Sequence, residues 1–341
     1  MRGFDDCFII AELGTSFYDF VTIHNAINAK EAATTMIFAA QACGANAVKF
    51  QVYKADRLTS NPKDIEYFSK YDLLDYDDYI ELIDFANSVG IEPIATLFDE
   101  EAVEVLGPKL KMFKIASPDI TYKQLIQKIA KFWKPIFLST GASKQIDIHR
   151  AINWIHEVGQ SPIRLMHCVA SYPTKKEDVN LSLIKELFSF NSSFYDIQVG
   201  YSDHSIFDLE TLKTAYLLGA RFIEKHFTLD KGIDGNDHFH SMDEDDLKSL
   251  VKSIKDLKVL FGDVNICHKD LQCEKPVRTY GRRSIHAKED IEKGEVMSED
   301  RITYLRPGTG IPPYMSFDIL GRKTLTKIKK GSIINHSMLK K

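Results

Sequence analysis

The sequence predicts a closed barrel of eight parallel strands with helices between them, followed by a small β-rich module. The first observation is an alternation of short apolar runs with amphipathic segments of helical length, which is typical of parallel α/β folds. The second is that eight such runs precede residue 262, and eight parallel strands close a (β/α)8 TIM barrel. The third is the length of 341 residues, which suits a barrel of about 250 residues plus a module.

The predicted strands share an apolar centre, and nearly every one has a polar residue near its C-terminal end. They are residues 7–13, 46–51, 92–97, 112–116, 135–140, 164–168, 196–201 and 221–227. Helical periodicity covers 79–89, 122–132, 145–158, 209–218 and a further segment from Asp243 to Gly262. The long Tyr- and Asp-rich segment 53–78 is poorly periodic, so we expect an active-site loop with a short helix there.

The domain boundaries follow from a change in the sequence pattern near residue 262. Residues 1–262 form the predicted barrel, and residues 263–279 lose periodicity and are interpreted as a linker. Residues 280–341 contain short β-like pieces, glycine turns and prolines, and form the predicted module. Within it, residues 291–296 and 328–333 resemble each other as a turn followed by an apolar run.

Composition excludes several classes of protein. Apolar residues make up 44% and charged residues 27%, which is ordinary for a globular protein with a large core. The net charge of −4 argues against nucleic acid as the main partner. No apolar run approaches the roughly 18 residues of a membrane span, and the N-terminus has no features of a signal peptide. The five cysteines are scattered and odd in number, which is typical of reduced thiols, so we expect a cytoplasmic protein.

Two predicted strands each end in a histidine. The last strand leads through His226 into a Gly- and Asp-rich loop, and alternation along it puts Glu224 on the same face as His226 and Lys225 on the other. The preceding strand ends just before His204. Each histidine alone could equally be an ordinary core or surface residue. Together they favour a shared metal or phosphate site, because a parallel barrel gathers its strand ends on one face.

Two lysines lie inside otherwise apolar strands. Lys49 and Lys114 each need an anionic partner if they are buried. Either could instead be a residue of the lower barrel or one that reaches solvent with its ammonium group. Hydroxyl side chains end the neighbouring strands, which favours a cradle for a phosphate or a carboxylate. These hydroxyl residues are Thr96, Ser117, Ser139 and Ser202.

Ordered motifs along nearly the whole chain resemble the sialic acid synthase family, whose members condense phosphoenolpyruvate with an N-acylated amino sugar. The motifs are IIAELG (9–14), GANAVKFQ (44–51), FKIASPD (113–119), LSTGAS (138–143), HCVASYPT (167–174), GYSDHS (200–205), EKHFTLDK (224–231) and GNDH (235–238). Downstream, RRSIHAKEDIEKGE and LRPGTG resemble the antifreeze-like (SAF) module of that family. The resemblance therefore implies a synthase that forms a nonulosonic (sialic) acid and releases phosphate.

The resemblance also implies roles for individual residues. His204 and His226 would hold a divalent cation, most often Mn²⁺, with Mg²⁺ or Co²⁺ as alternatives. The residues implied to bind phosphoenolpyruvate are Lys49, Thr96, Lys114, Ser117, Ser139 and Ser202. Those implied to line the reacting centre or the sugar site are Glu12, Gln51, Asp119, Tyr172 and Asp237. In family members the module of one subunit covers the barrel of the other, so Arg306 would reach the partner's sugar in a domain-swapped homodimer.

The expected chemistry suits these residue types. Carbon 3 of the enol attacks the sugar aldehyde, and a cation can polarise the carbonyl oxygen as a Lewis acid. Positive charge then develops on the enol carbon, which takes up water, and Glu12 or Asp237 could orient or deprotonate that water. The sequence does not choose between these two carboxylates.

Four departures from the family pattern cluster around the acceptor sugar. They are the loop from Thr15 to Asp19, Asp119 where many members have Glu, Ala170 where Ser or Asn is frequent, and Asn236 where proline is common. We therefore expect an altered acceptor sugar. The family includes synthases of N-acetylneuraminate, legionaminate and pseudaminate, and the sequence alone does not select one.

Two other functions fit parts of the pattern. A Schiff-base aldolase on the same barrel would use Lys49, Lys114 or Lys225 as its nucleophile. A non-catalytic sugar-binding protein would bind through the terminal module. The first requires a lysine with an accessible, deprotonated amine, which is a property of the folded site.

Overall fold

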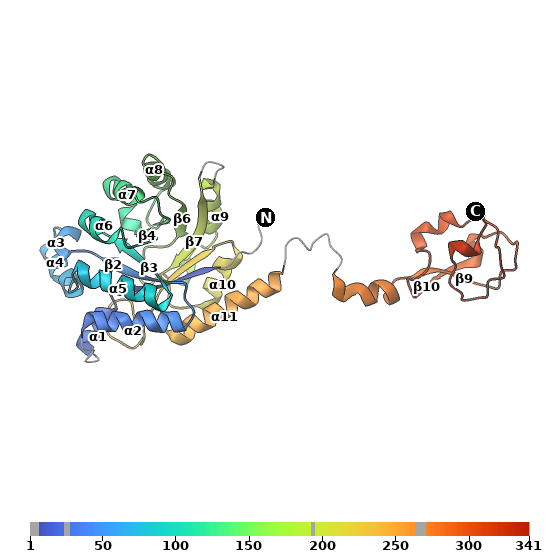
Figure 1. Ribbon diagram of the computed structural model, residues 1–341, viewed down its shortest axis with the longest axis horizontal. Coiled ribbons are helices and arrows are strands. Elements are labelled where there is room, and N and C mark those ends of the chain that lie inside the picture. The colour runs from blue at the N-terminus through green and yellow to red at the C-terminus, as the bar shows by residue number, and fades with distance from the viewer. Residues whose placement is uncertain (1–6, 24–27, 192–194, 263–270, 341) are drawn as a thin grey trace. The chain divides into compact units, whose positions relative to one another are not determined.

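The computed structural model describes residues 7–23, 28–191, 195–262 and 271–340. The chain divides into two compact units after Phe261, and each is described by itself (Figure 1). The first unit contains strands β1 to β8 and the helices around them, and the second contains the short strands β9 and β10.

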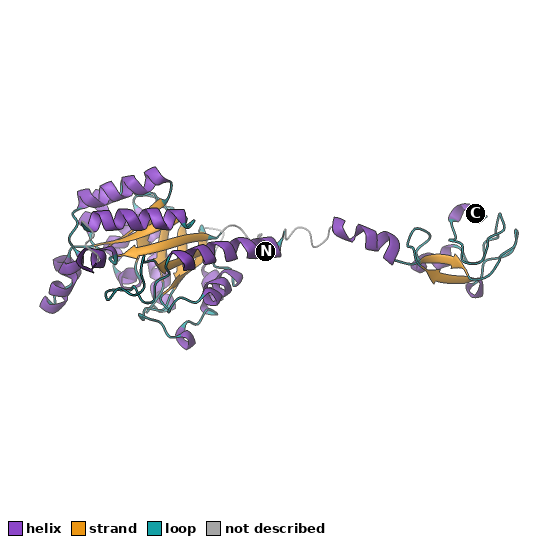
Figure 2. Cartoon of the chain, turned by 90° about the horizontal axis from the view of Figure 1, so that it is seen from below, coloured by secondary structure: helices purple, strands orange, loops and turns teal. Residues whose placement is uncertain are grey.

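The first unit is a closed barrel of eight parallel strands in sequential order, as predicted. The strands are β1 (Phe8–Gly14), β2 (Ala47–Val52), β3 (Glu92–Leu97), β4 (Phe113–Ile115), β5 (Ile136–Ser139), β6 (Ile163–His167), β7 (Ile197–Asp203) and β8 (Phe222–His226). Each coincides with a predicted strand, and the largest difference is β7, which continues two residues past the predicted end. Figure 2 shows the strands of this unit enclosed by helices.

The helices between the strands confirm the predicted periodic segments and add others. The predicted ones are α5 (Tyr76–Val89), α7 (Lys123–Ala130), α8 (Gln145–His156), α10 (Leu209–Leu217) and α11 (Glu244–Phe261). The additional ones are α1 (Phe17–Ile23), α2 (Ala29–Ala42), α6 (Glu100–Leu106) and α9 (Leu183–Leu187). The segment 53–78 is more helical than predicted, with α3 (Ala55–Leu58), α4 (Pro62–Phe68) and a 3₁₀ turn (Ser69–Tyr71). Side-chain caps at Asn61 and Asp75 help to fix the start of α4 and of α5.

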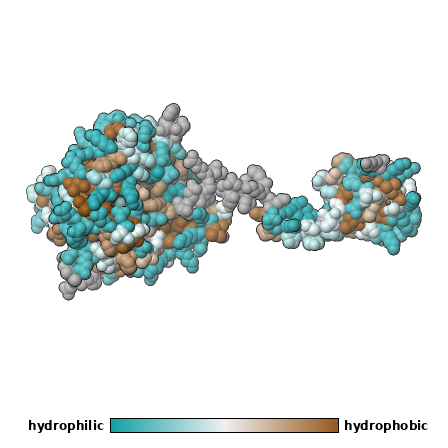
Figure 3. All heavy atoms as spheres, in the orientation of Figure 1, coloured by the Kyte–Doolittle hydropathy of each residue, from teal (hydrophilic) through white to brown (hydrophobic). Residues whose placement is uncertain are grey.

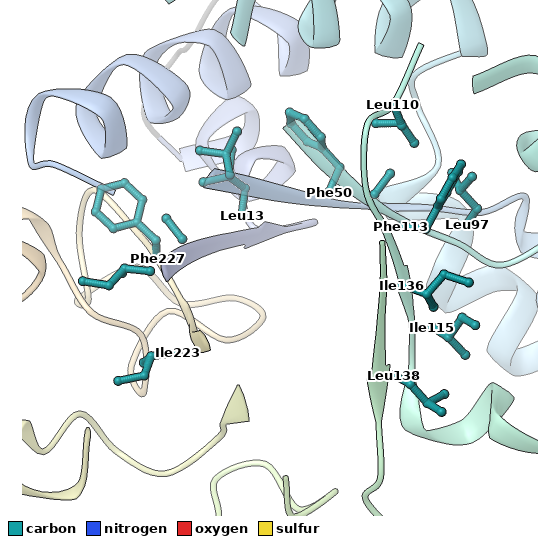
Figure 4. Close-up of a cluster of buried hydrophobic side chains, with 14 of the residues drawn as sticks. Leu13, Phe50, Leu97, Leu110, Phe113, Ile115, Ile136, Leu138, Ile223 and Phe227 are labelled. Atoms are coloured by element: carbon teal, nitrogen blue, oxygen red, sulfur yellow. The ribbon is translucent and has the colours of Figure 1, made fainter. Parts of the chain in front are cut away.

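Two apolar cores flank the strands. The larger one lies between the strands and the helices, and Figure 4 shows part of it, including Leu13, Phe50 and Phe113. The smaller one fills the interior of the barrel at the N-terminal ends of the strands, with Ile10, Phe137 and Met166 among its members. Residues two positions further along β1 and β5, Glu12 and Ser139, are buried and polar. Since alternate residues share a face, the polar layer lies directly above the apolar one, at the C-terminal ends.

A buried ion pair lies on the outer face of β7 and β8. Lys225 Nζ is 2.7 Å from Asp203 Oδ2 and donates a second hydrogen bond to the Ser205 carbonyl. Tyr201 and Ser205 both donate to the same carboxylate. Both charged side chains are completely buried, so this network fixes the two strands against each other away from the barrel interior.

The second unit is a small β-rich body, and its surface in Figure 3 mixes hydrophilic and hydrophobic residues. Strand β9 (Ser284–Ala287) pairs antiparallel with β10 (Ile302–Leu305) over a core that is mostly isoleucine. The two segments that resemble each other in sequence meet here, because Ile291 and Ile328 form a β-bridge with hydrogen bonds of 2.8 Å in both directions. Of the predicted linker, residues 263–270 lie outside the described residues. The rest is helical in part, with turns at Gln272–Glu274 and Val277–Gly281.

Among the described residues, no helix is both long enough and apolar enough to cross a bilayer.

The buried pair gives a test of the barrel packing. Lys225→Met should lower the free energy of unfolding by about 3–5 kcal/mol, because it leaves Asp203 charged and buried without its cation. Lys109→Met is the matched control, since Lys109 and Asp84 form a pair of similar length that is about half exposed, and it should cost less than about 1 kcal/mol. Urea unfolding of the two variants measures both values. Equal losses would contradict the buried role of Lys225.

Candidate functional site

Most of the residues predicted from the sequence surround one cavity at the C-terminal ends of the strands. The cavity has a volume of about 60 Å³, and side chains of β1 to β5 and β8 contribute to its lining, together with residues of the following loops. Ten predicted residues line it: Glu12, Lys49, Gln51, Thr96, Lys114, Ser117, Ser139, Tyr172, His204 and His226. Ser202 lies at its edge, bonded to a lining residue, and Asp237 lies beside His226. A cavity of this size holds a few water molecules.

Two further predicted residues are not among those that line the cavity. Asp119 is in the 3₁₀ turn Ser117–Thr121. Arg306 is an exposed residue of the second unit.

A cluster of two lysines and two glutamates forms the floor of the cavity. Lys49 Nζ is 2.6 Å from Glu12 Oε2 and donates to Thr96 Oγ1 at 3.1 Å. Lys114 Nζ is 3.1 Å from Glu224 Oε1, which lies 3.8 Å from Lys49 Nζ. The register of β1 with β2 and β8 places Glu12 beside both Lys49 and His226. The contact between Glu12 and Lys49 is therefore fixed by strand pairing. The anionic partners required by the buried lysines are therefore carboxylates of the protein itself.

The two glutamates differ in proton affinity. Burial raises the pKa of Glu12 by more than the nearby charge of Lys49 lowers it. Burial acts on Glu224 as well, but Lys114 and Lys49 together with the Ser202 hydroxyl lower its pKa overall. Ser202 Oγ donates to Glu224 Oε1 at 3.0 Å. Glu224 is thus the fixed anion of the cluster, and Glu12 is the carboxylate that can accept a proton.

The histidines lie on one side of the same cavity. The rings of His204 and His226 have centroids 6.0 Å apart. His204 Nδ1 is 2.8 Å from the Val169 carbonyl, and its Nε2 is 3.2 Å from the Tyr172 hydroxyl. Burial lowers the pKa of His204 to about 4 and lowers the pKa of His226 as well. Both imidazoles are therefore neutral near pH 7, which is the form that binds metal ions.

A third histidine contributes to a group that could hold a metal ion. One ligand atom from each of His226, Asp237 and His240 lies within 4.8 Å of the other two. Desolvation also raises the pKa of Asp237. The donor set of two imidazoles and a carboxylate suits Mn²⁺, Fe²⁺, Co²⁺ or Zn²⁺.

The loop that carries Asp237 is seated on the unusual Thr15–Asp19 segment, which the structure shows as a turn leading into helix α1 and not as a loop. Asp19 Oδ2 accepts a hydrogen bond from the backbone N–H of Asn236 at 3.1 Å and is 3.2 Å from His238 Nε2. A Cβ atom on Gly235 would come within 2.5 Å of the Asp19 carboxylate, so any other residue there would have to displace Asp19. Tyr67 of α4 donates to Asn236 Oδ1. Two of the departures from the family pattern, Asp19 and Asn236, thus contact each other beside the cavity.

The lysines do not have the surroundings of a Schiff-base nucleophile. Lys225 is on the outer face of the barrel, completely buried and paired with Asp203. Lys49 is paired with Glu12, and these carboxylates raise its pKa despite the opposing effect of burial. Lys114 is paired with Glu224. An ammonium group held by a carboxylate lacks the free electron pair that the aldolase chemistry requires.

Sequence reasoning did not assign Glu224, His240 or Asp19 to the site. Glu224 shares a strand face with His226, and two buried lysines pointing into one barrel needed compensating carboxylates, so charge balance could have identified it. His240 belongs to a loop, where the sequence gives no register. Asp19 lies in the short helix α1, and its contacts with Asn236 and His238 join segments more than 200 residues apart.

A larger cavity of about 430 Å³ opens nearby, between the segments that follow β5 and β6. Its lining is mostly apolar and includes Ile148, Leu187 and Phe190, with His167 hydrogen-bonded to the Val179 carbonyl. Since it contains no cluster of charged groups, the smaller cavity is the candidate site.

The chain matches two family models. Residues 36–265 match the model described as NeuB family, and residues 282–340 match the one described as SAF domain.

Characterised relatives cover almost the whole chain. It is 34% identical over 347 residues to the N,N'-diacetyllegionaminic acid synthase of Legionella pneumophila, covering 96% of this chain and 93% of that protein. It is 31% identical over 345 residues to the pseudaminic acid synthase of Campylobacter jejuni, covering 97% and 96%. The crystal structure of N-acetylneuraminic acid synthetase from Leptospira borgpetersenii, in complex with citrate, superposes with a TM-score of 0.70 at 29% identity, covering 80% of this chain and 90% of that one.

The surroundings of Asp119 predict a pH-dependent stability. Burial raises the pKa of Asp119 from 3.8 to about 6. Between these values the folded chain binds more protons than the unfolded chain, so the contribution of Asp119 to stability falls as pH rises from about 4 to 6. Asp119→Asn removes this pH-dependent loss. The free energy of unfolding of the variant, relative to wild type, should therefore be higher at pH 7.5 than at pH 4 by about 1–3 kcal/mol.

Urea unfolding at both pH values measures this difference. Asp84→Asn is the control, since Asp84 is mostly exposed, and its effect should be the same at both. If the effect of Asp119→Asn on stability were also the same at both pH values, burial of the charged Asp119 carboxylate would not lower the stability of the protein.

Asp19 gives a test of the loop seat. Asp19→Ala removes the acceptor for the Asn236 amide, so hydrogen exchange of residues 235–238 should become at least about tenfold faster. Exchange detected by mass spectrometry measures this. Asp245→Ala, at a position 95% exposed on α11, is the control. If both variants exchanged alike, Asp19 would not hold the loop.

Proposed function

Because this chain belongs to the NeuB family, we propose that it condenses phosphoenolpyruvate with an amino sugar of the N-acetylmannosamine type. The products would be a nonulosonic acid and phosphate. Its named relatives are legionaminic, pseudaminic and N-acetylneuraminic acid synthases. The observation that carries the proposal is the joint lining of one cavity by the Lys49 and Lys114 ion pairs and by His204 and His226.

The two lysines are suited to bind the enol phosphate. With Glu12 and Glu224 ionised, the four charges of the cluster sum to zero, so an incoming trianion gains little net attraction from it. Binding requires the lysines to exchange carboxylate oxygens for phosphate or carboxylate oxygens of the substrate. Ser139 Oγ is buried on the cavity wall without a hydrogen-bond partner among the described residues, so it can donate to the same ligand. Thr96, Ser117 and Ser202 complete this binding set.

The neutrality of the cluster favours a cation beside it. We assign His204 and His226 as residues that would hold a divalent ion, with Mn²⁺ preferred and Mg²⁺ or Co²⁺ as alternatives. The residues fit such an ion, because His226 Nδ1 is buried without a hydrogen-bond partner among the described residues. When bound, the ion would supply positive charge for the substrate anion and polarise the aldehyde oxygen.

Proton transfer is assigned to Glu12. Its Oε1 accepts a hydrogen bond from Gln51 at 2.9 Å, and its Oε2 faces Lys49. When Lys49 turns to the substrate, Glu12 loses its main counter-charge and becomes more basic. It can then take a proton from the water that attacks the enol carbon. We assign Asp237, beside His226, and Tyr172, on the cavity wall, to orient the sugar and this water. Glu224 would remain ionised as the anchor of Lys114.

The acceptor sugar is expected to differ from that of typical members. Asn236 is held by both Asp19 and Tyr67, which gives this edge of the site a polar wall in place of the common proline. We also propose a domain-swapped homodimer in which Arg306 of one subunit reaches the sugar of the other. The described cysteines are free thiols, which supports a reducing, cytoplasmic setting.

A substrate panel tests the proposal. Phosphoenolpyruvate with N-acetylmannosamine or with 2,4-diacetamido hexoses should release phosphate only when the right sugar is present, and the product should contain a new carbon–carbon bond. A chelator should abolish the reaction, and Mn²⁺ should restore it. Lys49→Met should reduce turnover by at least about 100-fold, because it removes a charge that positions the substrate.

Lys109→Met, far out on the surface, is the matched lysine control and should retain full turnover. Absence of phosphate release with every sugar would refute the synthase. Inactivation by borohydride in the presence of substrate would instead support a Schiff-base aldolase.

A further inference from the structure

We propose that His240 is a direct ligand of the divalent cation, so that His226, Asp237 and His240 form a three-ligand site on this chain. The inference deepens the proposed function and rests on it for the presence of a cation. It concerns a residue to which neither the sequence patterns nor the named relatives assign a role.

The geometry of the three side chains is close to that of a metal site. His240 Nε2 is 3.4 Å from Asp237 Oδ1, and His226 Nδ1 is 3.9 Å from Asp237 Oδ2. Ligand atoms about 2.1 Å from an octahedral ion are separated by about 3 Å when adjacent and about 4.2 Å when opposite. The observed separations, all within 4.8 Å, therefore need only small side-chain rotations to close around one ion.

The hydrogen-bonding state of His240 points to a ligand. Both of its ring nitrogens are buried and have no hydrogen-bond partner among the described residues, and the side chain is only 1% exposed. A buried polar atom without a partner costs about 1–3 kcal/mol, and such atoms are rare in folded proteins. His226 Nδ1 has the same deficiency. A cation between the two rings and Asp237 would satisfy one nitrogen of each at once.

The neighbouring histidine of the loop shows the contrast. His238 Nδ1 is 2.7 Å from Thr228 Oγ1, and its Nε2 is 3.2 Å from Asp19. Both of its nitrogens are therefore engaged in holding the loop. His240, two residues later, is directed to the other side, where its ring lies 5.4 Å from that of His226. The loop thus uses one histidine for structure and leaves the other for a ligand.

The backbone of the loop is consistent with a functional constraint. Asp237 has a φ of 65°, in the left-handed region that non-glycine residues seldom occupy. The seat formed by Asp19 and Gly235 maintains this conformation. It brings the Asp237 carboxylate between the two imidazoles. Strain of this kind is retained where the surrounding structure requires a side chain in one place.

His204 differs from His240 in that both of its ring nitrogens have hydrogen-bond partners. Its Nδ1 is bonded to the Val169 carbonyl and its Nε2 faces the Tyr172 hydroxyl, so it would have to release Tyr172 in order to bind an ion. The three-ligand site therefore forms without substrate, and His204, which the proposed function also assigns to the ion, would join it only after releasing Tyr172. Affinity in the absence of substrate should thus depend more strongly on His240 than on His204.

Titration of the full-length, chelator-treated protein with Mn²⁺ alone tests this. Wild type should bind one Mn²⁺ per chain, measured from the loss of the free-ion electron paramagnetic resonance signal. His240→Gln should weaken binding at least tenfold, because one of three protein ligands is lost. In the bound state, pulsed resonance should detect two coupled imidazole nitrogens in wild type and one in His240→Gln.

His156→Gln is the control. Both ring nitrogens of His156 are also buried without a hydrogen-bond partner among the described residues. Unlike His240, His156 belongs to no group of potential metal ligands in the described part of the chain. It should bind Mn²⁺ as wild type does. Thermal unfolding in chelator checks that His240→Gln is folded, and His240→Asn replaces it if it is not.

Two results would overturn the inference: unchanged affinity and nitrogen coupling in His240→Gln, or no Mn²⁺ binding by wild type in the absence of substrate. Tight binding that depends on His240, without phosphate release from any sugar in the panel, would leave this site intact and refute the synthase instead.

Discussion

The structure of the candidate site depends on the mutual neutralisation of four buried charges. Burying the charges of Lys49 and Lys114 inside the barrel would be costly without Glu12 and Glu224, and burying the two carboxylates would be equally costly without the lysines. Such a cluster keeps polar groups in a protein core while contributing no net charge. In the proposed function the same groups bind substrate when a ligand takes over the role of the carboxylates, so the arrangement that permits folding would also prepare the site.

The barrel provides this cluster through its layering. Apolar side chains fill the interior at the N-terminal ends of the strands, and the next inward positions are charged. Parallel register aligns Glu12 with Lys49 and with His226, which places a carboxylate, an ammonium group and an imidazole at one height. On the outer face of β8, Lys225 pairs with Asp203 and contributes to packing. Its neighbours Glu224 and His226 point into the barrel and line the cavity, so successive residues of one strand have different roles.

The strands and the inward residues could be predicted from the sequence because a strand fixes direction through its period of two. Parallel order gathers the strand ends on one face, and Lys49, Lys114, His204 and His226 line one cavity there, as expected. Helix α2 escaped prediction because its alanine-rich sequence has little contrast between faces. The contacts of His240 could not be predicted because a loop has no period, and those of Asp19 could not because its partners lie in a segment more than 200 residues away. The predicted sugar contact of Arg306 depends on a second subunit, which one chain does not contain.

The central claim is that a neutral cluster binds the substrate anion only when a cation adds positive charge. Isothermal titration of the chelated protein with phosphoenolpyruvate, in the absence and presence of Mn²⁺, measures this directly. The account predicts binding at least tenfold tighter with Mn²⁺, because Lys49 and Lys114 are already paired without it. Equal affinity in the two titrations would contradict the account, since the lysines would then be available to the anion on their own.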